Sequence, residues 1–196
     1  MSKAVQTIWL EHVNISSVLA CLRYLSDEIA AGRWQPDFQL LSDILDYMAE
    51  FPDQMHHPKE EQYLLKALRA RRPESEAMLA KVHEEHVEGA RMLAELRTKL
   101  HAYEDDPQGN AEAFVQAAHA YVAFERRHMA LEERELLPLA MRSLKREDWQ
   151  SIDAAFADNE DPLFGTARRA QFERLFQHIL DLAPGPMGFG AEPGAH

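Results

Sequence analysis

Two segments of the chain pair a histidine with a carboxylate at the same spacing. Glu60 stands four positions after His56, and Glu132 stands four positions after His128. When the two copies are aligned without a gap, a pair of leucines also follows at the same offset in each. Residues four apart lie on one face of an α-helix, one turn apart. Each copy is therefore predicted to direct one imidazole and one carboxylate to the same point.

Two further histidines lie in a second repeat. His12 and His86 are each preceded by a glutamate and followed by a valine. Leucines then recur at equal offsets: Leu19 and Leu22 in the first copy, Leu93 and Leu96 in the second. The chain thus consists of two similar halves, each with a one-histidine helix followed by a helix that bears His-x-x-x-Glu. Four such helices would bring four histidines and two glutamates to one core.

The ligand types in these repeats indicate which metals they suit. Imidazole and carboxylate together favour iron, manganese or zinc over calcium or magnesium. A structural zinc site uses four ligands, and the candidate ligands exceed that number. The surplus predicts two metal ions, bridged by the carboxylates and capped by the histidines, with water, oxide or dioxygen completing the coordination. The candidate ligands are His12, His56, Glu60, His86, His128 and Glu132.

Proline and glycine divide the chain into segments with helical spacing of apolar residues. No segment alternates polar and apolar residues at the period of a β-strand. We therefore expect an all-α protein, an up-down-up-down four-helix bundle with a short C-terminal helical extension. Breaks at 32–36, 71–73 and 105–110 leave predicted helical segments at 4–31, 37–70, 74–103 and 111–146.

The segment that carries His56 is the one with unusual local signals. Asp37 follows a proline and is the predicted cap of its first turn. Pro52 and Pro58 flank the histidine. Because proline lacks an N–H and clashes with the preceding turn, a kink or a wider helical turn is expected beside the candidate ligands.

Three regions are expected along the chain. Residues 1–147 would form the bundle, and residues 148–183 a helical extension packed on it, with short helices near 148–157 and 166–182. Residues 184–196 are rich in glycine and proline and are expected to form a flexible tail. If the protein is a sensor, the C-terminal helix is the expected contact for a protein partner.

Composition limits the classes of partner and compartment. The 196 residues suit one domain with an appendage, and 46% of them are hydrophobic, as in globular proteins. A net charge of -12 argues against nucleic acid or an anionic membrane as the partner. The single cysteine, Cys21, cannot form an internal disulfide. With neither a signal peptide nor a membrane span evident, a cytoplasmic location is expected.

Taken together, the repeats resemble the HHE cation-binding class of bacterial hemerythrin-like proteins. The resemblance covers about residues 5–145. It implies a non-haem di-iron centre inside a four-helix bundle that binds dioxygen reversibly. Manganese and zinc are the other metals that the ligand types themselves suit. The motifs that carry the resemblance are Glu11-His12, His56-His57-x-x-Glu60-Glu61, Glu85-His86, and His128-x-x-x-Glu132-Glu133 with Leu136-Leu137-Pro138.

The resemblance implies a fifth histidine, because classical hemerythrins use five histidines and two carboxylates. His57 and His83 are the two candidates. His83 precedes His86 by three residues and can share its face. His57 adjoins His56 and would point about 100° away from it on a straight helix. The wider turn expected at Pro58 would change that direction, so both alternatives stay open.

These features favour a binding protein over an enzyme. The leading hypothesis is a carrier or sensor of dioxygen or a related small gas, because the ligand set is rich in histidine and no proton-delivery motif is evident. The alternatives are a di-iron enzyme acting on peroxide or nitric oxide, an iron-handling or cluster-repair protein, and a module with a structural metal. A ferritin-like centre needs Glu-x-x-His on two helices, and only Glu125 with His128 fits that pattern here.

Overall fold

The computed structural model describes residues 2–157 together with Ile179 and Asp181, and every element in this part is helical. The all-α prediction is therefore confirmed. Most of these residues form four long rods. The first rod is α1 (Lys3–Ala30) and the third is α5 (Glu76–Asp105). The second rod is continuous over residues 38–71 and consists of α2 (Phe38–Phe51), η1 (Pro52–His56), α3 (His57–Lys59), η2 (Glu60–Leu65) and α4 (Lys66–Arg71).

The fourth rod and one shorter helix complete the described part. This rod covers residues 107–143 and consists of α6 (Pro107–Leu131), η4 (Glu132–Leu136) and α7 (Leu137–Ser143). A short 3-10 turn, η3 (Pro73–Ser75), precedes α5, and α8 (Arg146–Ala157) follows the fourth rod. The helix expected near 148–157 is thus present as α8. The helix expected near 166–182 and the tail at 184–196 lie outside the described residues, apart from Ile179 and Asp181.

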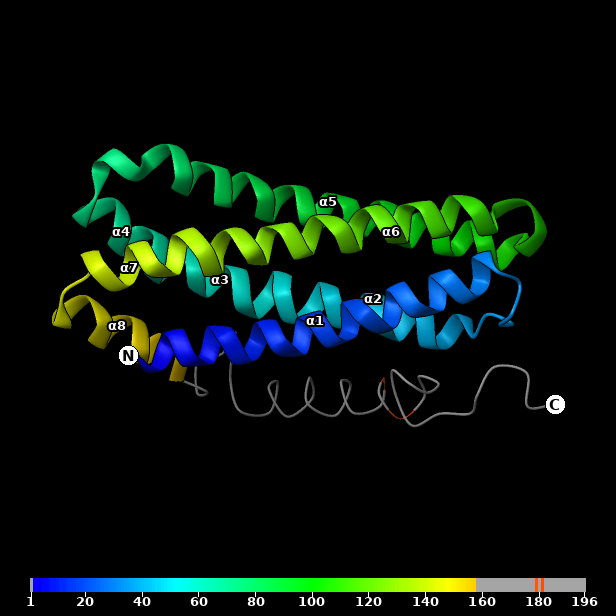
Figure 1. The fold of residues 1–196 in the computed structure, drawn as a ribbon, viewed down its shortest axis with the longest axis horizontal. Coiled ribbons are helices and arrows are strands. Elements are labelled where there is room, and N and C mark those ends of the chain that lie inside the picture. The colour runs from blue at the N-terminus through cyan, green and yellow to red at the C-terminus, as the bar shows by residue number, and fades with distance from the viewer. Residues whose placement is uncertain (1, 158–178, 180, 182–196) are drawn as a thin grey trace.

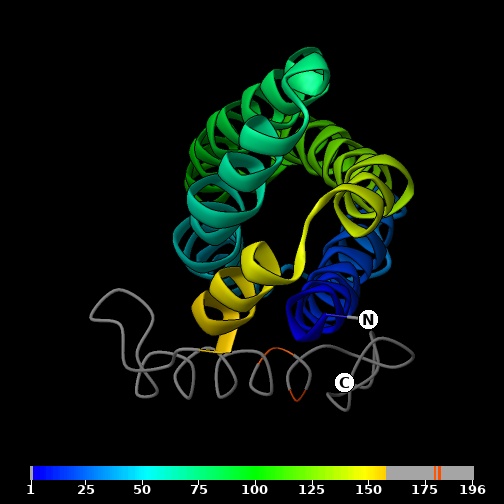
Figure 2. The same ribbon diagram turned by 90° about the vertical axis from the view of Figure 1, so that its left-hand side faces the viewer.

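The rods lie side by side with their connections at alternate ends (Figure 1). The connections after α1 and after α5 lie at one end, and η3 lies at the other end, which also carries α8 and the N-terminus. Seen along the rods, α8 lies against α1 and the η2 part of the second rod (Figure 2). Ile152 and Phe156 of α8 are buried there. None of the helices in the described part is long and apolar enough to cross a bilayer.

Local sequence accounts for the turns between rods. After α1, Gly32 takes φ 65° and its N–H bonds to the carbonyl of Ile29, a left-handed ending that favours glycine. Asp37 caps α2 as predicted, because its side chain accepts a hydrogen bond from the backbone N–H of Leu40. The predicted break at 105–110 is too long, because α5 ends at Asp105 and α6 begins at Pro107. Pro107 opens α6 and Asp106 caps it by accepting from Gly109, so the proline starts a helix instead of prolonging a loop.

The wider turn expected in the second rod is present as two π-helical stretches, η1 and η2. Pro52 opens η1 without an N–H to donate to the preceding turn, which favours a change from the α to the π pattern. The fourth rod carries one such stretch, η4, which aligns with η2 in the repeat. In both rods the glutamate of the His-x-x-x-Glu motif therefore opens a π-helical stretch, whereas His56 ends one and His128 lies on the regular helix α6.

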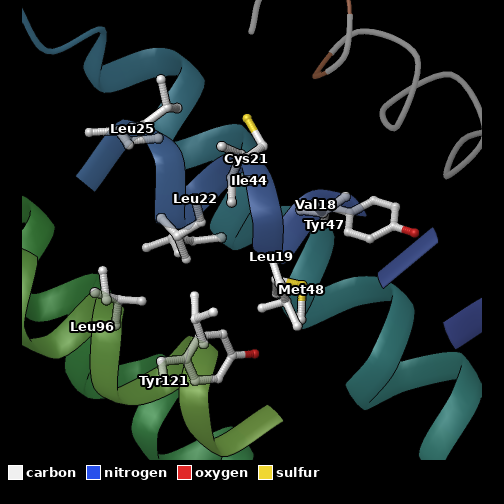
Figure 3. Close-up of a cluster of buried hydrophobic side chains, with 14 of the residues drawn as sticks. Val18, Leu19, Cys21, Leu22, Leu25, Ile44, Tyr47, Met48, Leu96 and Tyr121 are labelled. Carbon is white, nitrogen blue, oxygen red and sulfur yellow. The ribbon is translucent and has the colours of Figure 1, made fainter. Parts of the chain in front are cut away.

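Two apolar clusters lie on either side of the candidate ligands. The larger one joins all four rods: Val18, Leu19, Leu22 and Leu25 of α1 pack with Ile44 and Met48 of α2, Leu96 of α5 and Tyr121 of α6 (Figure 3). The second cluster includes Ile8, Leu65, Leu79, Leu136 and Phe156. Burial of each such side chain contributes about 2 kcal/mol. In α1 the polar His12 lies between Ile8 of one cluster and Ile15 of the other, so the candidate site is enclosed by apolar layers.

Candidate metal centre

The structure brings seven of the eight sequence-selected side chains together. They form two groups, within each of which one potential ligand atom per residue lies within 4.8 Å of all the others. One group is His12, His56, Glu60 and Glu132, and the other is His57, His86 and His128. All seven are buried. We refer to them as the two-histidine group and the three-histidine group.

The two glutamates lie between the groups. Glu132 has one oxygen 3.2 Å from His12 Nε2 and the other 3.3 Å from His128 Nε2. Glu60 has one oxygen 3.7 Å from His56 Nε2 and the other 3.5 Å from His86 Nε2. Each carboxylate therefore faces the histidine of its own rod and at least one histidine of another rod, since Glu132 also lies 3.4 Å from His86 Nε2. This arrangement suits carboxylates that bridge two cations.

The surroundings of Glu60 indicate whether these residues could bind a cation. Its side chain is fully buried, and neither of its oxygens has a hydrogen-bonding partner among the described residues. An isolated buried carboxylate is strongly unfavourable unless an opposite charge compensates it. The Nε2 atoms of His12 and His56 also face each other at 3.2 Å. Buried oxygens and inward-facing imidazole nitrogens together fit a site for metal cations.

Four of the histidines are held from outside by carboxylates on neighbouring rods. The contacts join Nδ1 to a carboxylate oxygen: His12 to Glu133 at 3.0 Å, His56 to Glu11 at 2.9 Å, His86 to Glu61 at 2.8 Å and His128 to Glu85 at 3.1 Å. An ionised carboxylate can only accept, so each Nδ1–H donates. The lone pair of each Nε2 then points inward, which is the tautomer that a metal requires.

These four contacts form a closed ring around the bundle. The first rod supplies a carboxylate to the second, the second to the third, the third to the fourth, and the fourth to the first. Each rod thus contributes one histidine and one outer carboxylate. The four outer carboxylates were not predicted as a set from the sequence. Their positions in the sequence nevertheless indicate them, because each stands next to a repeated histidine or glutamate.

His57 is the fifth histidine of the cluster. Its ring stacks on His86 with the centroids 4.2 Å apart, and its Nδ1 lies 3.4 Å from Asp53. On a regular helix His56 and His57 would point about 100° apart. The π-helical turns on both sides widen the helix, and both side chains are buried, each in a different group.

His83 lies outside both groups. Its side chain is 56% exposed, and its Nδ1 is 3.0 Å from the same Glu61 oxygen that holds His86. It lines an open surface pocket of about 250 Å³ between the second rod and α5, together with Asp53 and Val87. His83 therefore contacts the centre only through Glu61.

The inner glutamates control the protons on the histidines when no cation is present. Burial would lower the pKa of His12, but the hydrogen bond and charge of Glu132 outweigh it and raise that pKa to about 9. Burial is likewise outweighed at His86, where Glu132 and Glu60 raise the pKa to about 12. Burial and the neighbouring histidines hold the pKa of His57 well below its usual value. Cation binding must therefore displace protons from His12 and His86.

A further buried acid, Glu125, was considered in the sequence only as part of a ferritin-like pattern. It is 3% exposed and shares a hydrogen bond with Tyr121, and its Oε1 would lie 2.8 Å from a Cβ on Gly89. Gly89 stands three residues after His86 on α5, and the space beside its Cα is used by Glu125. Burial, reinforced by Asp53, raises the pKa of Glu125 to about 8.

Comparison with known families supports the same kind of site. The family described as hemerythrin HHE cation binding domain matches residues 3–140. Comparison with curated proteins and with solved structures gave no match. The matched region includes both repeats and all seven clustered side chains. Since it covers most of the chain, this protein belongs to the hemerythrin HHE cation-binding family.

Proposed function

We propose that this protein holds a non-haem di-iron centre in an up-down-up-down four-helix bundle and binds dioxygen or a related small gas there. The observation that carries the proposal is the pair of buried groups that share Glu60 and Glu132. His12 and His56 would hold one ion, and His57, His86 and His128 the other. Both ions would share the two carboxylates. The cation-binding family supports this assignment.

Iron is the metal that the donor set favours. Imidazole and carboxylate donors suit iron, manganese and zinc, while the absence of thiolate among these donors argues against a soft metal. Zinc sites usually have four ligands, and the three-histidine group with two shared carboxylates would supply five. If the purified protein contained manganese or zinc, the assignment of iron would be wrong.

The chain's own residues explain why binding is the favoured role. A di-iron centre supplies electrons and an open coordination position for a small gas. The outer carboxylates keep each Nε2 directed inward. The apolar clusters on both sides limit the access of water to the centre, which an open pocket reaches at His57 and His86. Imidazoles held by outer carboxylates between apolar layers suit reversible binding.

One observation favours a second candidate, an enzyme acting on peroxide or nitric oxide. Reduction of either molecule consumes protons, and the sequence showed no evident donor. Glu125 is a buried acid whose pKa is raised to about 8 by burial, so near neutral pH it retains its proton. It shares a hydrogen bond with Tyr121. Consumption of peroxide or nitric oxide by the iron-loaded protein, lost in Glu125→Gln, would support this candidate.

The deciding experiment is to purify the protein without oxygen, count metals per chain and record the visible spectrum before and after adding air. About two irons with a colour change that reverses when oxygen is removed are expected. Irreversible oxidation would favour the enzymatic candidate. One zinc ion per chain and no colour would overturn the proposal, although the helical fold would stand.

A further inference from the structure

An open pocket borders on the three-histidine group. The pocket between the second rod and α5 is lined by His57 and His86, two of the three histidines of that group. Both residues are buried, so the pocket reaches the edge of the group while the group stays enclosed. His57 lies on α3, a helix of three residues with a π-helical stretch on each side. The pocket therefore leads from solvent to the outer edge of the buried ligands, at an irregular part of the second rod.

The outer part of this pocket carries donors of the same types as the buried centre. It is lined by the exposed His83 and by the partly exposed carboxylates of Glu61 and Asp53. His83 donates its Nδ1–H to Glu61 at 3.0 Å, which leaves the lone pair of its Nε2 for a cation. Neither lysine nor arginine is among the described residues that line the pocket. Its volume of about 250 Å³ accommodates a divalent cation with several waters, since each water occupies about 30 Å³. The pocket therefore suits a hydrated cation.

The internal repeat shows that these outer donors belong to one half of the chain. In the register of the two one-histidine helices, Trp9 aligns with His83. An indole N–H can only donate, so Trp9 offers no lone pair to a metal. In the register of the His-x-x-x-Glu motifs, Glu125 aligns with Asp53. Glu125 is buried against Gly89 and Tyr121, whereas Asp53 lines the open pocket. The second half has thus kept no exposed set of this kind.

We propose that this pocket is the entry site for the metal ions, where His83, Glu61 and Asp53 capture a hydrated divalent cation before it reaches the buried ligands. This inference rests on the proposed di-metal function. Glu61 links the two sites, because the oxygen that accepts from His83 also lies 2.8 Å from His86 Nδ1. The two fully buried inner carboxylates attract the cation inward, where imidazoles replace its waters. Since the pocket holds the cation only in transit, it changes the rates of uptake and release by the same factor and leaves the affinity unchanged.

A charge placed at the mouth of the pocket tests the entry site. Val87 lines the pocket and is 60% exposed, while Val13, its counterpart in the first half of the repeat, is 63% exposed and does not line it. Ferrous iron is added to metal-free protein without oxygen, and uptake is timed by a chelator that traps the free ion. Val87→Lys should slow uptake about 10-fold at low salt, because the ammonium repels the cation. Val13→Lys, with the same net charge, should take up iron as wild type does. Equal uptake rates in the two lysine variants would overturn the inference.

Removal of the exposed imidazole tests the same site without an added charge. His83→Ala should slow both the uptake of iron and its release to excess chelator about 10-fold, with metal content and affinity unchanged. The matched control is His101→Ala, which removes another exposed histidine of α5 and should keep both rates. Wild-type rates in His83→Ala, or a lower equilibrium affinity, would contradict the inference. Absence of bound metal in wild type would instead refute the di-metal proposal itself, so the two failures are distinguishable.

Discussion

Glu133 on the fourth rod accepts a hydrogen bond from His12 on α1, with Oε1 3.0 Å from Nδ1. His12 in turn directs Nε2 to Glu132, the adjacent residue in the sequence, at 3.2 Å. One glutamate of the pair thus holds the histidine from outside, and the other meets it inside. The repeat reproduces this relationship in the second rod, where Glu61 holds His86 and Glu60 meets it from within.

Loss of an outer carboxylate should therefore weaken metal binding without changing the fold. Glu133→Gln removes the charge that keeps His12 Nδ1 protonated and Nε2 directed inward. We expect a decrease in metal affinity of about 10- to 100-fold, measured by competition with a chelator. The matched control is Glu135→Gln, an exposed glutamate on the same rod, which should bind as wild type does. Equal affinity in both variants would mean that His12 needs no outer partner.

The fifth histidine can be identified by comparing two single variants. His57→Ala should lower the metal content or affinity of the three-histidine group, because it removes an imidazole that lies in the cluster. His83→Ala should retain both metals, because this histidine is exposed and contacts the centre only through Glu61. Metal analysis after dialysis against chelator provides the measurement. The opposite ranking would assign the ligand to α5 instead.

The sequence was sufficient to select most of the clustered side chains because their register depends on helical periodicity. His56 with Glu60, and His128 with Glu132, are one turn apart on any helix, and repetition distinguishes them from chance. His57 could not be selected over His83, because its direction depends on the π-helical turns at η1 and η2. A widened turn is a shift in backbone hydrogen bonding that a fixed 100° period does not describe.

The hydrogen bonds between rods could not be predicted from local sequence patterns either. Glu11 holds His56 across 45 residues and Glu85 holds His128 across 43, so their roles appear only once the rods are packed. The start of α6 shows a different limit. Proline and glycine at 107–109 indicated a loop, but the same residues after an aspartate also suit a helix start. Packing of the helices decides whether residues 107–109 form a loop or the start of a helix.

The metal-free protein should lose stability as pH rises. The pKa of His12 is about 9 in the folded chain, above its ordinary value of 6.5, because Glu132 outweighs burial. A raised pKa means that the imidazolium stabilises the folded state fully below pH 6.5, and that this contribution is lost as pH rises through 9. Calorimetry between pH 6.5 and 9 should show a falling Tm for metal-free protein.

The metal-loaded protein provides the control for that trend. A metal held by Nε2 would leave these imidazoles only the Nδ1–H that they donate to the outer carboxylates, with no Nε2 proton to lose, so the Tm should change little over the same range. Metal affinity should correspondingly increase with pH, since binding displaces protons from His12 and His86. A Tm of metal-free protein that is level or rising from pH 6.5 to 9 would contradict the assignment of these protons.

Gly89 provides a test of how tightly Glu125 is held. Within a helix, Gly→Ala usually stabilises by about 1 kcal/mol. Here an added Cβ would lie 2.8 Å from Glu125 Oε1 and 3.4 Å from Phe124 Cε1. We therefore expect Gly89→Ala to reverse the usual sign and to destabilise the protein by about 1–3 kcal/mol in urea unfolding, since the buried carboxyl must move.

The double variant separates the crowding from the helix propensity. In a Glu125→Ala background the carboxyl is gone, and Gly89→Ala should then stabilise by roughly the ordinary 1 kcal/mol of helix propensity. The difference between the two backgrounds measures the interaction of position 89 with the buried acid. If Gly89→Ala stabilised the wild-type chain as much as the Glu125→Ala chain, the carboxyl would have free space beside it. Glu125 would then not be fixed in place between α5 and Tyr121.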